Sequence, residues 1–204
     1  MYVPDPFAER ELEVLHGWLR RFPFALLVTA AGGDFAATHL PFWLDPARGP
    51  QGTLYGHVAK ANPHWRCFDG TTRALAVFSG PHAYVSPRWY EREGVPTWNY
   101  VAVHAEGAPR RIEDAEQVQQ LLRRLTEVYE GEGGFAALPQ DLVARLSRGI
   151  VAFELPIERL TGKAKLSQNR TAGDRAGVIR GLEQQGEPHA REVAALLRAQ
   201  EARA

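Results

Sequence analysis

The stretch TLYGHVAKANPHW, residues 53–65, carries the pattern on which the fold prediction depends. Its first part, Thr53 to Ala59, mixes β-branched, aromatic and small apolar residues, and this composition predicts a short strand. Asn62 and Pro63 follow, and Asn at a cap position with Pro at the first helical position predicts a short helix. The stretch therefore predicts a strand that leads within a few residues into a helix, with polar side chains at the junction.

The polar residues at this junction indicate a binding function. Along the strand, His57 and Ala59 lie on one face, and Val58 and Lys60 lie on the other. A lysine beside a helix N-terminus can bind a phosphate, because the lysine supplies charge and the first helical turn supplies aligned N–H donors. The alternative is that Lys60 is a solvated lysine at a strand end and that Asn62 only caps the helix.

Short strands separated by turn signals recur along the chain. We expect them at residues 24–30, 35–43, 53–59, 73–79, 82–85, 97–106 and 150–155. Apolar residues at helical spacing predict helices at about 5–21, 113–129 and 139–147, and over 174–204 with an interruption at 186–188. Because strands and helices do not alternate regularly, the pattern favours an antiparallel barrel over a doubly wound parallel sheet. We expect one domain over 1–173, including inserted helices at about 113–148, and a helical extension over 174–204.

The bulk composition is that of a globular protein and excludes several classes. The chain has 204 residues, of which 45% are hydrophobic and 24% charged, and its formal net charge is zero. Bulk charge therefore gives no general affinity for nucleic acid or an anionic membrane, although it leaves room for a local basic patch. A single cysteine, Cys67, excludes an intrachain disulfide. Neither a secretory signal nor a membrane span is recognisable, and we expect a cytoplasmic protein.

The string PTWNY, residues 96–100, combines aromatic and amide side chains in one strand. Trp98 and Tyr100 share one face, and Asn99 lies on the other. Packing in the core is the usual role of such aromatic residues and explains them without a ligand. The functional interpretation is that Trp98 or Tyr100 borders an aromatic ligand while Asn99 hydrogen-bonds to its edge.

The string ATHLPF, residues 37–42, ends a strand with a histidine and a proline. Thr38 and Leu40 share one face, and His39 lies on the other. Pro41 cannot donate to a ladder, so we expect the strand end at an edge or a bulge. A single histidine in this position is either a structural residue or a ligand contact.

The string GKAKLSQN, residues 162–169, has an unusual density of hydrogen-bond donors for a segment that follows a strand. The donors are Lys163, Lys165, Ser167, Gln168 and Asn169. The segment is either an exposed loop or a cover that folds over a bound cofactor or an anionic partner. Because a buried polar group costs free energy unless it is paired, four such strings in one chain indicate a common ligand. Their aromatic and amide content favours a flat, phosphorylated ligand.

Several other chemistries lack their motifs. The sequence has no GxSxG element of a serine hydrolase, no HExxH and no CxxC, so it predicts no metal site. Gly162–Lys163 lacks the upstream glycine of a phosphate-binding loop, because Ile157 stands there. The glycines at 131–134 follow a helix rather than a strand, which is not the context of a dinucleotide-binding fingerprint. We therefore assign no catalytic residue from the sequence.

Taken together, the strings resemble the PaiB family, described as FMN-binding negative transcriptional regulators. The resemblance covers roughly residues 1–180 in order. It rests on MYVPDPF, FALLVTA, ATHLPF, GHVAKANPHW, FSGPHAYVSPRWY, VPTWNYVAVHAEG, GIVAFELPIERLTGK and KLSQNRTAGDR. It implies an α+β, mainly β fold: an antiparallel split β-barrel with peripheral helices, related to pyridoxamine-phosphate oxidase and flavin reductases. It also implies FMN as cofactor and a homodimer with two FMN sites across the subunit interface.

The resemblance also suggests which residues bind FMN. His57, Val58, Lys60 and Asn62 would bind the phosphate and ribityl chain, and Thr38, His39 and Leu40 would border the isoalloxazine ring. Trp98, Asn99 and Tyr100 would close the site from the partner subunit, and Lys163, Lys165, Ser167 and Gln168 would cover the ring or the substrate side. One departure is Ala164, where the family leads us to expect a bulkier, often aromatic residue.

Two functions remain open at this point. In the first, the chain is an FMN-binding repressor of transcription, with promoter DNA as a partner. In the second, it is an FMN-dependent oxidoreductase that affects transcription only indirectly. The sequence shows no helix-turn-helix and no basic stretch, and its best cationic region is 170–198, where arginines alternate with acids. If the chain is an enzyme, His39 and His57 are the candidates for proton transfer, because histidine titrates near neutral pH.

Overall fold

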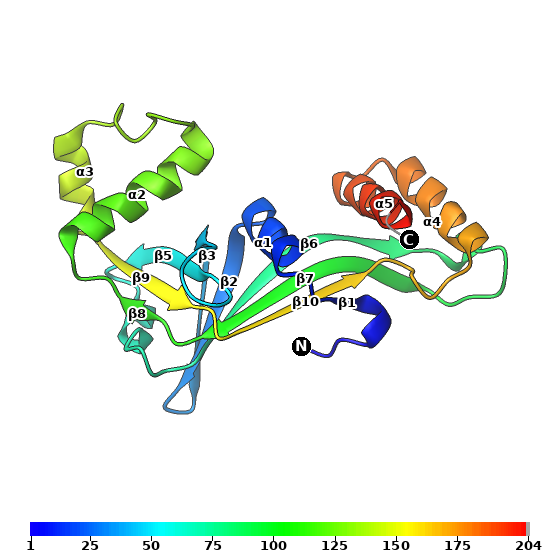
Figure 1. The fold of residues 1–204 in the computed structure, drawn as a ribbon, viewed down its shortest axis with the longest axis horizontal. Helices are drawn as coiled ribbons and strands as arrows, with labels where there is room; N and C mark the ends of the chain where they lie inside the picture. The colour runs from blue at the N-terminus through cyan, green and yellow to red at the C-terminus, as the bar shows by residue number, and fades with distance from the viewer. Residues whose placement is uncertain (203–204) are drawn as a thin grey trace. The chain divides into compact units, whose positions relative to one another are not determined.

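The computed structural model describes residues 1–202, which form two antiparallel sheets with helices beside them (Figure 1). The strand order is β1-β10-β7-β6-β2-β3 in the six-stranded sheet and β4-β5-β9-β8 in the four-stranded sheet. The strands are β1 (Ala8–Glu9), β2 (Phe24–Ala31), β3 (Asp34–Pro41), β4 (Trp43–Asp45), β5 (Thr53–Ala59), β6 (Ala74–Val85), β7 (Thr97–Gly107), β8 (Arg110–Arg111), β9 (Ile150–Pro156) and β10 (Arg159–Lys165). The α-helices are α1 (Leu12–Arg21), α2 (Ala115–Glu130), α3 (Gln140–Ser147), α4 (Ala172–Gln185) and α5 (Pro188–Glu201). Three 3₁₀ turns complete the described part: η1 (Asp5–Phe7), η2 (Pro63–Cys67) and η3 (Pro87–Trp89).

Contacts within the chain divide it into two compact units. Unit 1 comprises residues 1–15, 79–103 and the segment from 161 onward, and unit 2 comprises residues 16–78 and 104–160. Strands β6, β7 and β10 begin in one unit and end in the other. The boundary predicted at residue 173 lies within unit 1.

The core of unit 2 is built around aromatic side chains. The ring of Phe42 lies 5.5 Å from that of Phe78 and 6.0 Å from that of Phe153, measured between ring centroids. Next to them, β5 passes close to Leu40, and a Cβ at Gly56 would lie 2.8 Å from Leu40 Cδ1. Glycine at this position therefore allows the strand to approach its neighbours closely.

Helix α2 covers one face of the four-stranded sheet (Figure 1). Its residues Leu121 and Leu125 are buried against Tyr55 of β5 and Ala152 of β9. The helix begins where the Asp114 carboxylate accepts a hydrogen bond from the N–H of Gln117 at 2.8 Å, as the preference of aspartate for cap positions predicts.

In unit 1, α4 and α5 form a pair of neighbouring helices (Figure 1). Helix α4 packs closely on the turn η3, because a Cβ at Gly177 would overlap the carbonyl of Trp89 and one at Gly181 would overlap its ring. Near the start of the same helix, the buried Asp174 accepts the N–H of Glu91 at 2.9 Å. Glycines and a buried carboxylate thus hold α4 against the chain that follows β6.

Two predicted elements were wrong in their extent. The helix expected at 5–21 is only α1, because Ala8 and Glu9 pair with Lys163 and Gly162 of β10. The Glu9 carboxylate accepts the N–H groups of Arg10 and Glu11 at 2.9 Å each, so the helix begins after Glu9.

The strand break expected at Gly80–Pro81 is absent, and β6 is continuous over Ala74–Val85. Its pairing with β2 runs from Ala74 to Val77. Beyond that residue, one side of β6 needs no ladder donor from β2, so a proline can be accommodated. The segment RLTGKAK, for which no strand was predicted, is strand β10.

Candidate functional site

The turn between β5 and η2 contains a buried hydrogen-bond network in unit 2. Asn62 caps η2 as predicted, its Oδ1 accepting the N–H of His64 at 3.0 Å. Its Nδ2 donates to the hydroxyl of Thr38 on β3 at 3.0 Å. The Thr38 hydroxyl also lies 2.8 Å from His64 Nδ1, and the hydroxyl of Thr29 on β2 lies 3.0 Å from His64 Nε2. The network therefore ties the turn to two strands.

Burial lowers the pKa of His64, whose side chain is 2% exposed. The ring is therefore neutral at pH 7, with one nitrogen as donor and the other as acceptor. Because the Thr38 hydroxyl accepts from Asn62, it can donate its own proton to Nδ1, and Nε2–H can then donate to Thr29. Every polar atom of the network has a partner in this arrangement, which makes the turn rigid.

Lys60 lies within this turn with a fixed backbone and an exposed side chain. Its N–H donates to the carbonyl of Gly149 at 2.8 Å, and its own carbonyl accepts the indole N–H of Trp65 at 3.0 Å. Among residues 1–202, no carboxylate lies within ion-pair distance of its ammonium. The predicted helix end is weaker than expected, because η2 is a 3₁₀ turn of five residues. The case for a phosphate therefore rests on the Lys60 ammonium.

The other residues predicted in unit 2 are distributed over two faces. Leu40 and Val58 are buried at 4% exposure each, so they can border a ligand only through their backbone. His39 is exposed on β3, with its ring stacked 6.1 Å from that of Phe24. His57 lies on the opposite face of β5 from Val58 and lines a cavity of about 200 Å³ beneath α2 and α3.

Burial lowers the pKa of His57, and its Nδ1 is buried without a hydrogen-bond partner. Its neighbours in the cavity are mostly apolar, including Leu122, Phe135 and Val143. The structure thus brings Thr38, Lys60 and Asn62 together and leaves the His57 side chain outside this group.

In unit 1, the predicted donors are satisfied largely by one another. Asn99, fully buried on β7, donates to the hydroxyl of Ser167 at 2.9 Å. The Gln168 side chain accepts the N–H of Leu166 at 2.7 Å and donates to the carbonyl of Ala164. This small loop holds Ser167 at φ 59°, a conformation that non-glycine residues rarely adopt.

The two lysines of this segment also have partners within unit 1. Lys163 is 8% exposed, and its ammonium donates to the carbonyl of Tyr2 at 3.1 Å. The same ammonium lies over the rings of Tyr2 and Tyr100, at 5.6 and 5.3 Å from the ring centroids. The ammonium of Lys165 donates to the hydroxyl of Thr97. These contacts give Lys163 a structural role.

Among the residues of unit 1 that were predicted to bind FMN, the exposed side chain is aromatic. Trp98 is 52% exposed, and its ring lies 6.1 Å from that of Tyr84 and 6.2 Å from that of His82. His82 in turn packs edge-on against His189 of α5 at 4.6 Å. A flat ligand or a second protein surface could stack on this group, because both would cover exposed aromatic area.

His64 and Thr29 are residues of this site that the sequence did not predict. His64 stands inside the quoted string, two residues after the cap, but a histidine in a short helix has no distinctive pattern. Thr29 belongs to the apolar strand FALLVTA, where its hydroxyl is the one polar side-chain atom. Its position in an otherwise apolar strand was the available signal, because a buried hydroxyl requires a partner.

The residues present fit FMN, whose phosphate requires a cation and whose ring requires a flat face and hydrogen bonds at its edge. The exposed Lys60 ammonium supplies an unpaired cation, and the rigid turn of Thr38 and Asn62 supplies polar contacts beside it. The exposed ring of His39, stacked on Phe24, supplies a flat face in the same unit.

Comparisons with known proteins agree with these observations. Residues 1–159 match the family described as "Putative FMN-binding domain". The chain is 36% identical over 201 residues to "Protease synthase and sporulation protein PAI 2" of Bacillus subtilis, covering 97% of this chain and 96% of that protein. The resemblance seen in the sequence is therefore confirmed, and so is FMN as the cofactor that it implies.

Two solved structures share the fold. One is a flavocytochrome from Azotobacter vinelandii, with a TM-score of 0.64 and 16% identity, covering 83% of this chain and 75% of that one. The other is an FAD and heme binding protein from Mycobacterium smegmatis, with a TM-score of 0.65 and 15% identity, covering 83% and 78% of the two chains. The predicted antiparallel split barrel with peripheral helices is confirmed.

Proposed function

Because this chain belongs to the family described as "Putative FMN-binding domain", we propose that it binds FMN at the β5–η2 turn and acts as a negative regulator of transcription. The observation that carries the binding site is Lys60, an unpaired cation on a backbone fixed by hydrogen bonds to Gly149 and Trp65. Lys60 would bind the phosphate, and Asn62 and Thr38 would hold the turn in the conformation that presents it. Bound FMN supplies electron transfer, while the protein supplies orientation.

The remaining predicted contacts belong to this proposal. His39 and the backbone at Leu40 and Val58 would border the ring or ribityl chain. In the homodimer that we propose, Trp98 of one protomer would stack on the FMN of its partner, with Asn99, Tyr100 and the 163–168 segment behind it. The exposed aromatic group of Tyr84 and Trp98 supports such an interface, because aromatic residues are enriched at protein contacts.

The first test is an absorption spectrum of the purified protein after addition of FMN and desalting. We expect a retained flavin band and FMN release in an equimolar amount on denaturation. A colourless protein that also shows no quenching of FMN fluorescence would reject the site.

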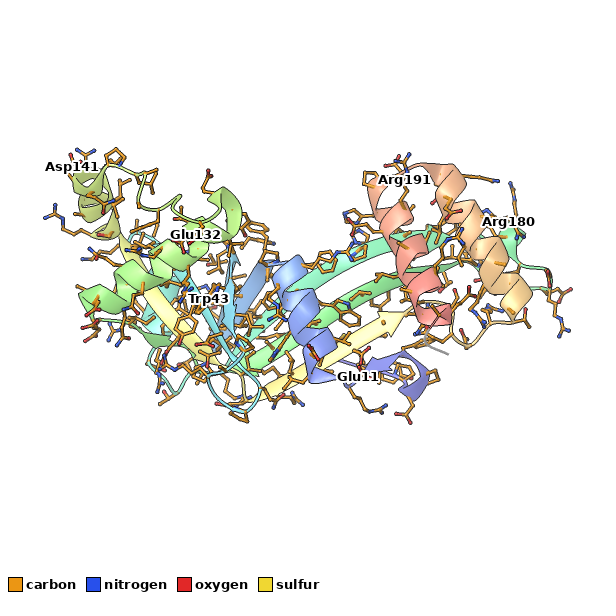
Figure 2. The ribbon with its side chains drawn as sticks, turned by 45° about the horizontal axis from the view of Figure 1, so that its top comes forward. Glu11, Trp43, Glu132, Asp141, Arg180 and Arg191 are labelled. Atoms are coloured by element: carbon orange, nitrogen blue, oxygen red, sulfur yellow. The ribbon has the colours of Figure 1, made fainter. Side chains whose placement is uncertain are left out.

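The regulatory part of the proposal is supported by the name of the Bacillus subtilis relative, which refers to protease synthesis and sporulation. Zero net charge means that DNA contact would depend on a local patch. On α4 and α5, Arg175 pairs with Glu201 and Arg198 with Glu183, at 3.0 and 2.7 Å. Arg180 and Arg191 are exposed and have no ion pair among residues 1–202 (Figure 2).

Direct DNA binding is tested with the DNA upstream of the protein's own gene. We expect a complex whose affinity falls as salt rises, because phosphate contacts release counterions. Arg180→Glu together with Arg191→Glu should abolish it, whereas Arg175→Gln, which removes a paired arginine, should retain it. Absence of a complex at low salt would refute direct binding.

The second candidate is an FMN-dependent oxidoreductase with an indirect effect on transcription. Zero net charge and the ion-paired arginines on α4 and α5 favour it over a DNA-binding protein. The discriminating measurement is oxidation of NADH or NADPH by the FMN-loaded protein. If the protein oxidises NADH or NADPH and forms no complex with DNA, it is an enzyme rather than a DNA-binding regulator.

The cellular compartment completes the proposal. Among residues 1–202, no helix combines the length and apolar character needed to cross a membrane. We place the protein in the cytoplasm, consistent with its single cysteine.

A further inference from the structure

Unit 2 has a second cavity on the four-stranded sheet, and none of its lining residues is among the fourteen assigned to FMN. Strand register places four side chains in one row across the sheet. Trp43 of β4 pairs with Tyr55 of β5, Tyr55 pairs with Glu154 of β9, and Glu154 pairs with Arg110 of β8. Between this row and α2 lies a cavity of about 380 Å³. Its size falls within the range of small-molecule sites, about 300–1,000 Å³.

The charges around this cavity are not balanced. The Glu154 side chain is 6% exposed and accepts two guanidinium groups, from Arg48 at 2.9 Å and from Arg110. Arg124 of α2 lies over the ring of Trp43 at 5.7 Å and has no ion pair among the described residues. The lining itself holds two guanidinium groups, those of Arg48 and Arg124, and one carboxylate, that of Asp45. Behind the lining, Arg110 pairs with Glu154, so the cavity keeps one positive charge for an anion.

The Glu154 carboxylate also fixes Arg48 in place. Arg48 donates to the hydroxyl of Tyr55 as well as to Glu154, so its side chain is held at the cavity wall. Burial and the neighbouring Glu154 raise the pKa of Tyr55, which stays protonated at neutral pH. An anion would therefore meet a guanidinium whose position is set before binding, which reduces the entropic cost of the contact.

Aromatic and apolar side chains line the cavity beside the arginines, and the guanidinium groups of Arg48 and Arg124 lie over the rings of Tyr55 and Trp43. The rings of Trp43 and Tyr55 lie 5.3 Å apart at an angle of 45°, and Ile112 and Leu121 extend this surface. Figure 2 shows Trp43 in the part of unit 2 covered by α2. An aromatic ring can stack on such a wall while a negative group reaches the arginines.

We propose that this cavity binds a small aromatic monocarboxylate, with its ring against Trp43 and its carboxylate between Arg48 and Arg124. The size of the cavity admits an acid of one or two rings. The site requires neither FMN nor DNA, so its test does not depend on whether the proposed function is correct.

The test is titration calorimetry of the full chain, saturated with FMN, using benzoate and indole-3-acetate as probes. Benzamide and indole-3-acetamide are the neutral controls, because they keep the ring and remove the charge. We expect saturable binding of at least one acid and an affinity about tenfold or more weaker for its amide, as expected for loss of a charged hydrogen bond.

Two variants of α2 locate the site. Arg124→Gln should weaken binding of the acid about tenfold to a hundredfold. Arg123→Gln is the matched control: it removes the same charge from the adjacent residue, whose guanidinium lies over Phe135 rather than Trp43. This variant should bind as the wild type does. In NMR spectra, the indole N–H signal absent from Trp43→Phe should shift on titration of the wild type.

Three results would overturn the proposal. The first is no saturation by either acid up to about 10 mM, where even a site with a Kd of about 1 mM would be filled. The second is equal affinity for acid and amide. The third is an effect of Arg123→Gln as large as that of Arg124→Gln, which would show long-range attraction by the helix rather than a site.

Discussion

Replacement of Lys60 by alanine tests the assignment of the FMN phosphate most directly. The ammonium is exposed and unpaired, so the substitution should leave the fold intact and remove one charged hydrogen bond to the phosphate. Such bonds contribute about 1.5–3 kcal/mol, and because Lys60 is exposed to solvent we take the lower end. A loss of about 1.5 kcal/mol corresponds to an increase of about tenfold in the Kd for FMN.

The measurement is titration of FMN fluorescence at low and high salt. Arg66→Ala is the matched control, because Arg66 is an exposed cation of the same turn whose guanidinium lies over the ring of Trp65. Both variants lose one positive charge, but only Lys60→Ala should lose affinity at low salt. Raising the ionic strength from about 0.01 M to about 1 M should reduce the difference, because an exposed ion pair is screened. Lys60→Arg should keep most of the affinity.

Two outcomes would refute this reasoning. If Lys60→Ala binds FMN as the wild type does at low salt, Lys60 does not contact the phosphate. If Lys60→Ala and Arg66→Ala weaken binding equally, the attraction is a general effect of charge near the turn, and the fixed backbone of Lys60 is irrelevant.

Three further predictions concern stability. Burial lowers the pKa of His57, His64 and His104 from the usual 6.5, so the unfolded chain binds more protons than the folded chain just below that pH. The free energy of unfolding, measured by urea titration, should therefore fall as the pH drops from about 7 to about 5, and a free energy that does not change with pH would contradict this. Thr38→Val leaves Asn62 and His64 without their shared partner and should cost about 1–3 kcal/mol, while Thr38→Ser should not, as judged by urea midpoints. Gly177→Ala would push a Cβ into the Trp89 carbonyl and should destabilise the protein by about 1–3 kcal/mol, whereas Gly17→Ala, whose Cβ would meet nothing within 4 Å, should stabilise α1 by up to about 1 kcal/mol. If both variants shift the melting temperature equally and in the same direction, α4 is not closely packed at Gly177.

The sequence predicted best those elements whose signals are local. Strand β5 and the Asn62 cap were confirmed because the strand-forming residues, the cap residue and the following proline all lie within a few positions of one another. The break expected at Gly80–Pro81 failed because only the register with β2 shows that one side of β6 is unpaired there. Strand β10 was missed because its residues, RLTGKAK, lack apolar alternation, and its Gly162 is needed only because Leu15 packs directly on it.

In the candidate site, too, local patterns could be predicted from the sequence and contacts between distant residues could not. Asn62 and Lys60 could be predicted from their spacing, but the hydrogen bond from Asn62 to Thr38 could not. The role of His64, whose two ring nitrogens reach hydroxyls on separate strands, could not be predicted either. No spacing along the chain indicates that Thr29 and His64, 35 residues apart, meet in the core. The row of Trp43, Tyr55, Glu154 and Arg110 is likewise a product of strand register and spans more than a hundred residues.

Lys60 and Lys163 show why a donor-rich string cannot by itself identify a phosphate site. Each follows an apolar strand residue and is close to further polar residues, so the sequence pattern gives both lysines the same predicted role. In the fold, the Lys163 ammonium is enclosed by two tyrosine rings and the Tyr2 carbonyl, and moving it to a phosphate would break all three contacts. The Lys60 ammonium would break none. Since a binding cation contributes only what remains after its existing contacts are lost, we propose Lys60 as the phosphate ligand although Lys163 lies in the richer string.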